Sequence, residues 1–222
     1  MFFFSAIQHG DHEEVQRLLD IQRDLIFAQD ENGKSPILAA AYANKREIAN
    51  FLAEKTVLLN IFEAATIGKL THIIRLLAKD PSEVNAHAND GSQPLELAAY
   101  FGHIDVADYL LKAGASVNSS QKNEEKLTPL HIATLNGHLE TAGFLIANGA
   151  EVNIHQIDGL TPLHIAAKKG YFSMVRLLLY NGADQSLESA DGKTPLDYAR
   201  ENGHTDTLDL LEQGITKRFR SA

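Results

Sequence analysis

The sequence predicts an all-α repeat solenoid of about seven stacked units. The tetrapeptide Thr-Pro-Leu-His occupies residues 128–131 and, 33 residues later, residues 161–164. A variant that ends in Asp follows at residues 194–197, after another 33 residues. A fixed period of this length is typical of architectures in which each unit packs against the next one.

A glycine closes the first helix of each unit and sets the register of the repeat. Small residues stand four and three positions before it, as Ala166 and Ala167 do before Gly170. These anchors lie at positions 10, 44, 68, 102, 137, 170 and 203, with Asn at 44, so the steps are 34, 24, 34, 35, 33 and 33. We therefore expect one solenoid over residues 1–214 and a basic tail over residues 215–222. The expected units cover about 1–30, 31–56, 57–88, 89–120, 121–155, 156–188 and 189–214, with the first and last as caps.

Each unit is expected to begin with a short helix. Thr128, Thr161 and Thr194 can accept hydrogen bonds from the unpaired N–H groups at its start. The proline that follows each threonine suits the first helical position, where its missing N–H costs nothing. The closing glycine ends the helix in a left-handed conformation, which costs other residues roughly 1 kcal/mol.

A second helix should follow the glycine, and a hairpin or loop should lead to the next unit. Val175 and residues 177–179 place apolar side chains at helical spacing. The step of 24 residues is about ten residues short, so we expect no projecting hairpin between units two and three. Residues 62–68 parallel residues 4–10, as if the array restarted there. Units one and two thus form an added block, and we predict a bend or a widened gap at residues 54–60.

These motifs and spacings resemble the ankyrin repeat, whose core is Thr-Pro-Leu-His-x-Ala. The resemblance covers almost the whole chain, closely in the last four units and more weakly in the first three. The layout is similar to that of the small stand-alone ankyrin proteins common in bacteria. The resemblance implies helix-turn-helix units joined by a β-hairpin or loop, and partner proteins bound at the concave face and the hairpin tips.

The composition restricts the classes of partner. The formal net charge is −9, which argues against nucleic-acid binding through a basic surface. The absence of cysteine fits a reducing cytoplasm. Residues 2–4 are all Phe, a run too short to span a membrane; these rings either cover the open end of the first helix pair or contact a membrane or a partner. We expect a cytoplasmic monomer that binds neither nucleic acid nor membrane.

No motif for catalysis, a metal or a cofactor stands out. Lys34 and Lys193 mimic the end of a phosphate-binding loop, but the first glycine of such a loop is missing. Five of the ten histidines recur at fixed repeat positions, which are His103, His131, His138, His164 and His204. We interpret them as hydrogen-bonding elements of the repeat, and we expect no enzyme, no metal site and no cofactor.

Partner contacts are expected at the two variable positions before each closing glycine and at the tips. Apolar side chains there are not needed for stacking, and an exposed apolar stripe favours an interaction site. The candidates before the glycines are Tyr42, Ile67, Tyr100, Phe101, Leu135, Lys168 and Lys169, and those on the tips are Leu127, Ile157 and Leu160. Glu124 and Glu125 lie in the same lengthened tip as Leu127. Alternatively, Tyr100 and Phe101 cover the adjacent hairpin or pack on Tyr42.

The function expected from these features is a non-enzymatic scaffold or adaptor that binds a partner protein. One alternative is a dedicated inhibitor or regulator of a partner enzyme. Another is a self-associating structural protein, joined through residues 2–4 or through the aromatic stripe.

Overall fold

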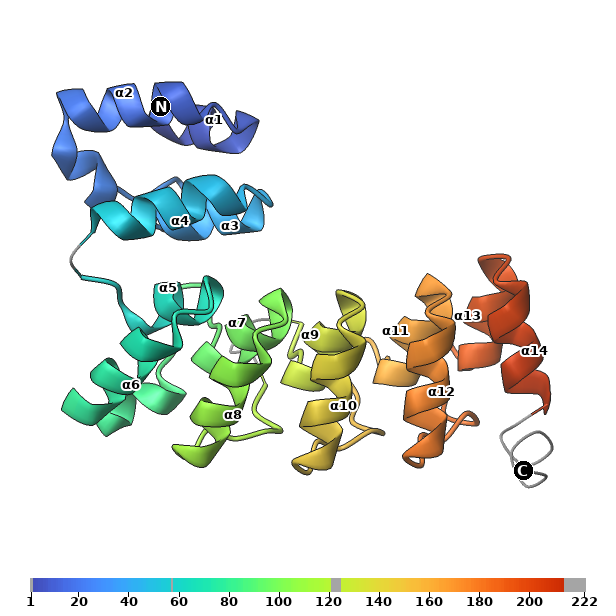
Figure 1. Cartoon of the computed structure of the whole chain (residues 1–222). Coiled ribbons are helices and arrows are strands. Elements are labelled where there is room, and N and C mark those ends of the chain that lie inside the picture. The colour runs from blue at the N-terminus through green and yellow to red at the C-terminus, as the bar shows by residue number, and fades with distance from the viewer. Residues whose placement is uncertain (1, 57, 121–124, 214–222) are drawn as a thin grey trace.

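The computed structural model describes residues 2–56, 58–120 and 125–213, where fourteen α-helices form seven successive pairs (Figure 1). The first helices are α1 (Phe2–His9), α3 (Pro36–Tyr42), α5 (Ile61–Thr66), α7 (Pro94–Phe101), α9 (Pro129–Leu135), α11 (Pro162–Lys169) and α13 (Pro195–Glu201). The second helices are α2 (His12–Ile21), α4 (Arg46–Lys55), α6 (Leu70–Lys79), α8 (Ile104–Lys112), α10 (Leu139–Ala147), α12 (Phe172–Tyr180) and α14 (Thr205–Gln213). The predicted helical solenoid is confirmed. Glu124 and the expected basic tail, residues 215–222, lie outside the described residues.

The described tips contain tight turns at residues 31–33, 89–91, 157–159 and 190–192, and the described residues include no β-strand. In the tip of unit six, the Gln156 N–H donates to the Leu160 carbonyl at 3.1 Å. The 3₁₀ helices η1 (Arg23–Phe27) and η2 (Pro81–Asn85) follow α2 and α6. Units one and three therefore share a third element that the later units lack, in agreement with their parallel sequences.

The predicted helix caps are present, and each is reciprocated. The Thr161 hydroxyl accepts from the His164 N–H at 3.4 Å, and the Thr161 N–H donates to His164 Nδ1 at 3.1 Å. Two unpaired N–H groups at the helix start are satisfied in this way. The same exchange occurs between Asn60 and Glu63, Thr128 and His131, and Thr194 and Asp197.

The core runs along the solenoid as a strip of small and branched side chains. Ala166 and Ala167 of α11 are completely buried, and so are Leu163 and Leu178. Because alanine adds little bulk, the first helices of adjacent units approach closely. Gly170 ends α11 at φ 68°, and a Cβ there would come within 2.5 Å of the His204 ring of the next unit. Glycine is therefore required at this position for its conformation and for its size.

Histidines that follow the closing glycine join adjacent units by hydrogen bonds. The Nε2–H of each ring donates to a backbone carbonyl of the preceding unit, two residues before its glycine. The pairs are His103 with Thr66 at 3.0 Å, His138 with Tyr100 at 2.8 Å, and His204 with Lys168 at 3.1 Å. These histidines are structural, as the sequence predicted.

Asparagines make a second row of hydrogen bonds between adjacent units, beside the residues that follow the second helices. We call the two rows the histidine ladder and the asparagine ladder. The Asn118 amide donates to the Gly149 carbonyl at 3.1 Å, and its oxygen accepts from the Glu151 N–H at 2.9 Å. Asn85 and Asn153 make equivalent pairs of bonds to the units that follow them. A recurring Val-Asn dipeptide at residues 84–85, 117–118 and 152–153 was the available signal.

The solenoid changes direction between units two and three. Figure 1 shows α1–α4 running across the view, whereas α6, α8, α10 and α12 run steeply down it. Only residues 56–60 separate α4 from α5, which is the short connector that the sequence spacing implied. Among the described residues, no hydrogen bond of the histidine or asparagine ladder joins unit two to unit three. The predicted bend is confirmed.

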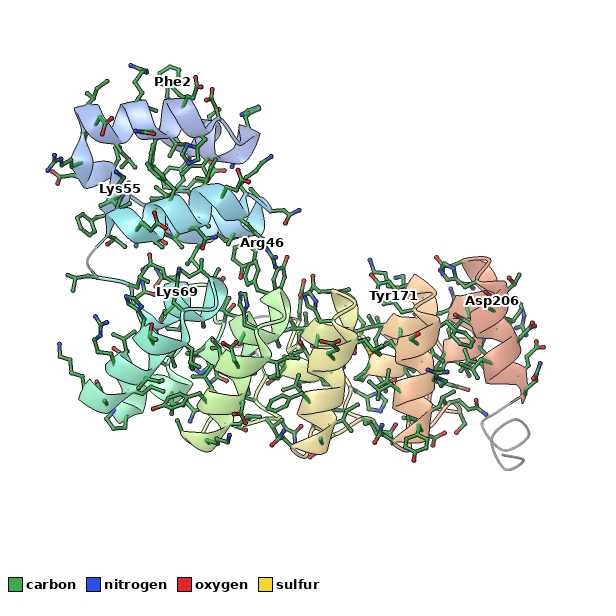
Figure 2. The ribbon with its side chains drawn as sticks, in the orientation of Figure 1. Phe2, Arg46, Lys55, Lys69, Tyr171 and Asp206 are labelled. Carbon is green, nitrogen blue, oxygen red and sulfur yellow. The ribbon has the colours of Figure 1, made fainter. Side chains whose placement is uncertain are left out.

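The three N-terminal phenylalanines divide between core and surface. Phe3 is buried in the core and Phe4 is half-buried against it, which agrees with the interpretation that these rings cover the open end of the first helix pair. Phe2 is 83% exposed and stands at the outer edge of the N-terminal block in Figure 2. Covering the end therefore explains two of the three rings.

Candidate partner-binding site

Three of the candidate residues form an aromatic cluster inside the bend. The Tyr42 ring centroid lies 5.2 Å from that of Tyr100 and 5.5 Å from that of Phe101, both edge-on, and the last two rings are 4.8 Å apart. Such separations are favourable for aromatic rings. Tyr42 belongs to unit two and the others to unit four, so the cluster links units that are not neighbours. Of the two alternatives, packing on Tyr42 is the one that the structure has.

Tyr42 is held in place by its surroundings. The Lys34 ammonium lies 4.2 Å from its ring centroid, a favourable cation–π arrangement. Burial, with a smaller effect of Asp90, raises the pKa of the Tyr42 phenol well above its usual range. The phenol therefore stays neutral at physiological pH, as a packed side chain should.

A cleft of about 390 Å³ opens beside this cluster, between α3 and α4 on one side and the ends of α5, α7 and α9 on the other. We call it the elbow cleft. Its lining includes Tyr42, Arg46, Ile67, Tyr100, Phe101 and His138. Figure 2 places Arg46 at the end of α4 that lies nearest to α7. The elbow cleft exists because the N-terminal block does not stack on unit three in the regular way.

A second cleft, of about 320 Å³, lies between units five and six. We call it the tip groove, and its lining includes Leu127, Leu135, Leu160, Ile165, Lys168 and Lys169. Leu127 and Leu160 come from successive tips, whereas Leu135 and the two lysines come from the ends of α9 and α11. The tip groove thus lies where the first helices meet the tips.

Hydrogen bonds hold the walls of the tip groove in place. The fully buried His131 donates from Nε2 to the Leu160 carbonyl at 3.1 Å and accepts at Nδ1 from the Thr128 N–H. The tips of units five and six are also joined directly, because the Ile157 N–H donates to the Glu125 carbonyl at 3.3 Å. Burial lowers the pKa of His131 to about 4, so the ring is neutral when it makes these bonds. A preformed groove loses little conformational entropy on binding.

The tip groove presents apolar and positive groups together. Leu135 is 36% exposed, and both lysines are exposed. The Lys168 ammonium lies 5.6 Å from the Tyr198 ring centroid and is drawn toward unit seven. Among the described residues, no salt bridge includes Lys169. Glu125 and Asp158, one from each of the two tips, add two acidic groups to the lining.

Nine of the ten candidate residues line one of these two clefts. Tyr42, Ile67, Tyr100 and Phe101 are half-buried and line the elbow cleft. The tip groove takes Leu127, Leu135, Leu160, Lys168 and Lys169. Ile157 is 56% exposed on the tip but does not line the groove. The apolar stripe expected from the sequence is therefore two separate surfaces, one of which is mostly covered by its own side chains.

Sequence reasoning missed several residues of both surfaces. Arg46 stands two residues after the anchor Asn44, a position that only the bend brings to α7. Ile165 and Gln156 line the tip groove without being at variable positions before a glycine. The histidines at 103 and 138 were assigned a structural role, which they have, and they line the elbow cleft as well.

The described residues include no group of three or more His, Cys, Asp or Glu side chains placed to hold a metal ion. Within the same part of the chain, no helix has both the length and the apolar character that crossing a membrane requires.

Comparison with known proteins agrees with the repeat pattern. A family model described as ankyrin repeats (3 copies) matches residues 61–156 and 130–220. Similar curated proteins include alpha-latrocrustotoxin-Lt1a of Latrodectus tredecimguttatus, 32% identical over 121 residues, which are 51% of this chain and 8% of the toxin. Human ankyrin repeat domain-containing protein 49 is 39% identical over 56 residues, 25% of this chain and 23% of that protein. Human oxysterol-binding protein-related protein 1 is 39% identical over 67 residues, 30% of this chain and 7% of that protein. The chain spans less than a quarter of each of these relatives.

Proposed function

Since the chain belongs to the ankyrin-repeat family, we propose that it is a non-enzymatic adaptor that binds a partner protein through the tip groove and the adjoining tips. Ankyrin repeats are generally protein–protein interaction modules and are typically non-enzymatic. The partner would present an apolar ridge to Leu135 and a carboxylate to Lys169. The sequence contains no cysteine, which agrees with a protein that functions in a reducing cytoplasm.

The observation that carries this proposal is the exposure of apolar side chains beside a preformed groove. Leu135 and Ile157 are 36% and 56% exposed, although both lie on firmly hydrogen-bonded elements. Side chains held in this way lose little entropy when a partner covers them, and covering a large apolar side chain stabilises a complex by roughly 1.5–3 kcal/mol. Lys169 at the rim adds attraction for an acidic group and speeds encounter.

Affinity capture from the source lysate tests the proposal with a matched pair of variants. Leu135→Ser removes an apolar contact from the tip groove, whereas Leu139→Ser removes one of similar exposure, 39%, from the start of α10. We expect Leu135→Ser to lose a stoichiometric partner that both the wild type and Leu139→Ser retain. Circular dichroism of both variants controls for folding. Equal capture by the two variants would refute the assignment of the tip groove.

A further inference from the structure

The elbow cleft has one permanent charge, the cation Arg46, in a chain that is acidic as a whole. The formal net charge of the chain is −9. The described residues that line the cleft include Arg46, His103 and His138 and no Asp or Glu. A cleft whose charge opposes that of the surrounding surface attracts anionic groups selectively.

Arg46 is the permanent charge of this cleft. It is exposed, and no salt bridge of the described residues includes it. Its field extends across the bend to His103. The pKa of His103 lies below its usual range chiefly because the ring is buried, and Arg46 and His138 act in the same direction against the opposing effects of the Thr66 carbonyl and Asp105.

The other groups of the cleft suit a peptide. Asn44, Asn50 and Asn136 contribute side-chain amides, which can pair with peptide N–H and C=O groups. The Asn136 amide already donates to the Ile132 carbonyl at 2.9 Å, so its oxygen remains as an acceptor. Tyr100 and Phe101 provide an aromatic wall for the apolar stem of a side chain. One permanent cation is too few for a nucleic-acid strand, whose binding depends on several phosphate contacts.

We propose that the elbow cleft is a second binding site, for an acidic peptide segment of a partner protein, in which Arg46 pairs with a carboxylate side chain. The volume, about 390 Å³, lies at the lower end of the range of ligand pockets, roughly 300–1,000 Å³. Arginine is suited to this role because its planar fork matches a carboxylate with two hydrogen bonds. The site extends beyond the tip groove, since it needs the two-unit block that precedes the regular array.

Selection from a displayed library of random heptapeptides tests this site. The library is selected on the full wild-type chain and depleted on Arg46→Ala. We expect the surviving peptides to share an Asp or Glu at one position. A fluorescent copy of one such peptide should lose affinity roughly tenfold or more on Arg46→Ala, or when its acidic residue is replaced by the amide.

Three control variants make the result specific. Arg75→Ala removes an exposed charge from α6, outside the cleft, and should leave binding unchanged. Arg46→Lys keeps the charge but loses the fork, so it should bind with intermediate affinity. Leu135→Ser should bind the peptide normally, which separates this site from the tip groove.

Three outcomes would overturn the proposal. The first is a library that yields no peptide preferring the wild type to Arg46→Ala. The second is a set of selected peptides without a shared acidic position. The third is a labelled single-stranded oligonucleotide that binds through Arg46 more tightly than the selected peptide does.

Discussion

Replacement of Glu96 by glutamine should stabilise the protein at neutral pH. Glu96 is the third residue of α7 and is 1% exposed. One carboxyl oxygen accepts from the Gln93 N–H at 2.8 Å, and the other is buried without a hydrogen-bond partner. Burial raises the pKa of Glu96 to about 8. A glutamine keeps the accepting oxygen and cannot ionise.

The sign and size follow from linkage. Because the folded-state pKa lies above the unfolded value of 4.5, the contribution of Glu96 to stability is intact below pH 4.5 and is lost as the pH rises toward 8. The loss amounts to about 1 kcal/mol at pH 5 and about 3 kcal/mol at pH 7. Glu96→Gln should recover these amounts, since its amide binds no proton in either state.

Urea denaturation followed by circular dichroism at pH 5, 6, 7 and 8 would measure the difference. We expect the midpoint of Glu96→Gln to exceed that of wild type least at pH 5 and by a steadily larger amount as the pH rises. Glu63→Gln, at the same position of α5, is the control, because the Glu63 carboxylate also accepts from the N–H of its cap residue, Asn60, but has no buried oxygen without a hydrogen-bond partner. A constant difference between wild type and Glu96→Gln at every pH would refute the reasoning.

Three other substitutions test separate parts of the structure. Wild type should lose about 3 kcal/mol of unfolding free energy between pH 7 and pH 4 that His131→Gln does not lose, because the folded-state pKa of His131 is about 4 whereas the unfolded chain takes up the proton near pH 6.5. Urea midpoints at both pH values measure the difference, and an equal loss in the two proteins would contradict it. Asn118→Ala should cost about 1–2 kcal/mol by removing two hydrogen bonds between units, with faster hydrogen exchange at the Glu151 amide; unchanged exchange would count against the ladder. Tyr42→Ala should remove two ring contacts, each of which stabilises the protein by about 0.5–1.5 kcal/mol, and should increase the radius of gyration measured by X-ray scattering. An unchanged radius would show that the aromatic cluster does not hold the bend.

The sequence was sufficient to predict the two helices of each unit because the signals of the repeat are local, but it did not predict the 3₁₀ helices η1 and η2. Thr161 and the proline after it start a helix, and Gly170 ends it, whatever the rest of the chain does. The shortened step before Gly68 predicted the bend for the same reason, since a connector without a tip cannot stack two units in the regular way. Residue type and spacing carried these predictions.

The two surfaces could be predicted only in part, because they depend on geometry between units. The spacing identified Tyr42 and Tyr100 as off the stacking core, but the angle of the bend decides that their rings meet. The same angle brings Arg46 to the end of α7. Packing of Tyr100 and Phe101 on Tyr42 was one of the alternatives that the sequence left open, but nothing in the sequence pointed to Arg46. The sequence likewise did not predict which carbonyl each buried histidine would bind, such as that of Leu160, which accepts from His131.

The most direct test of the adaptor assignment is site-specific photocrosslinking in the source lysate. A benzophenone amino acid would replace Ile157 beside the tip groove in one variant and Tyr180, 80% exposed at the end of α12, in another. Binding through the tip groove predicts one discrete crosslinked partner from position 157 and none from position 180. A discrete product from position 180 alone would contradict it.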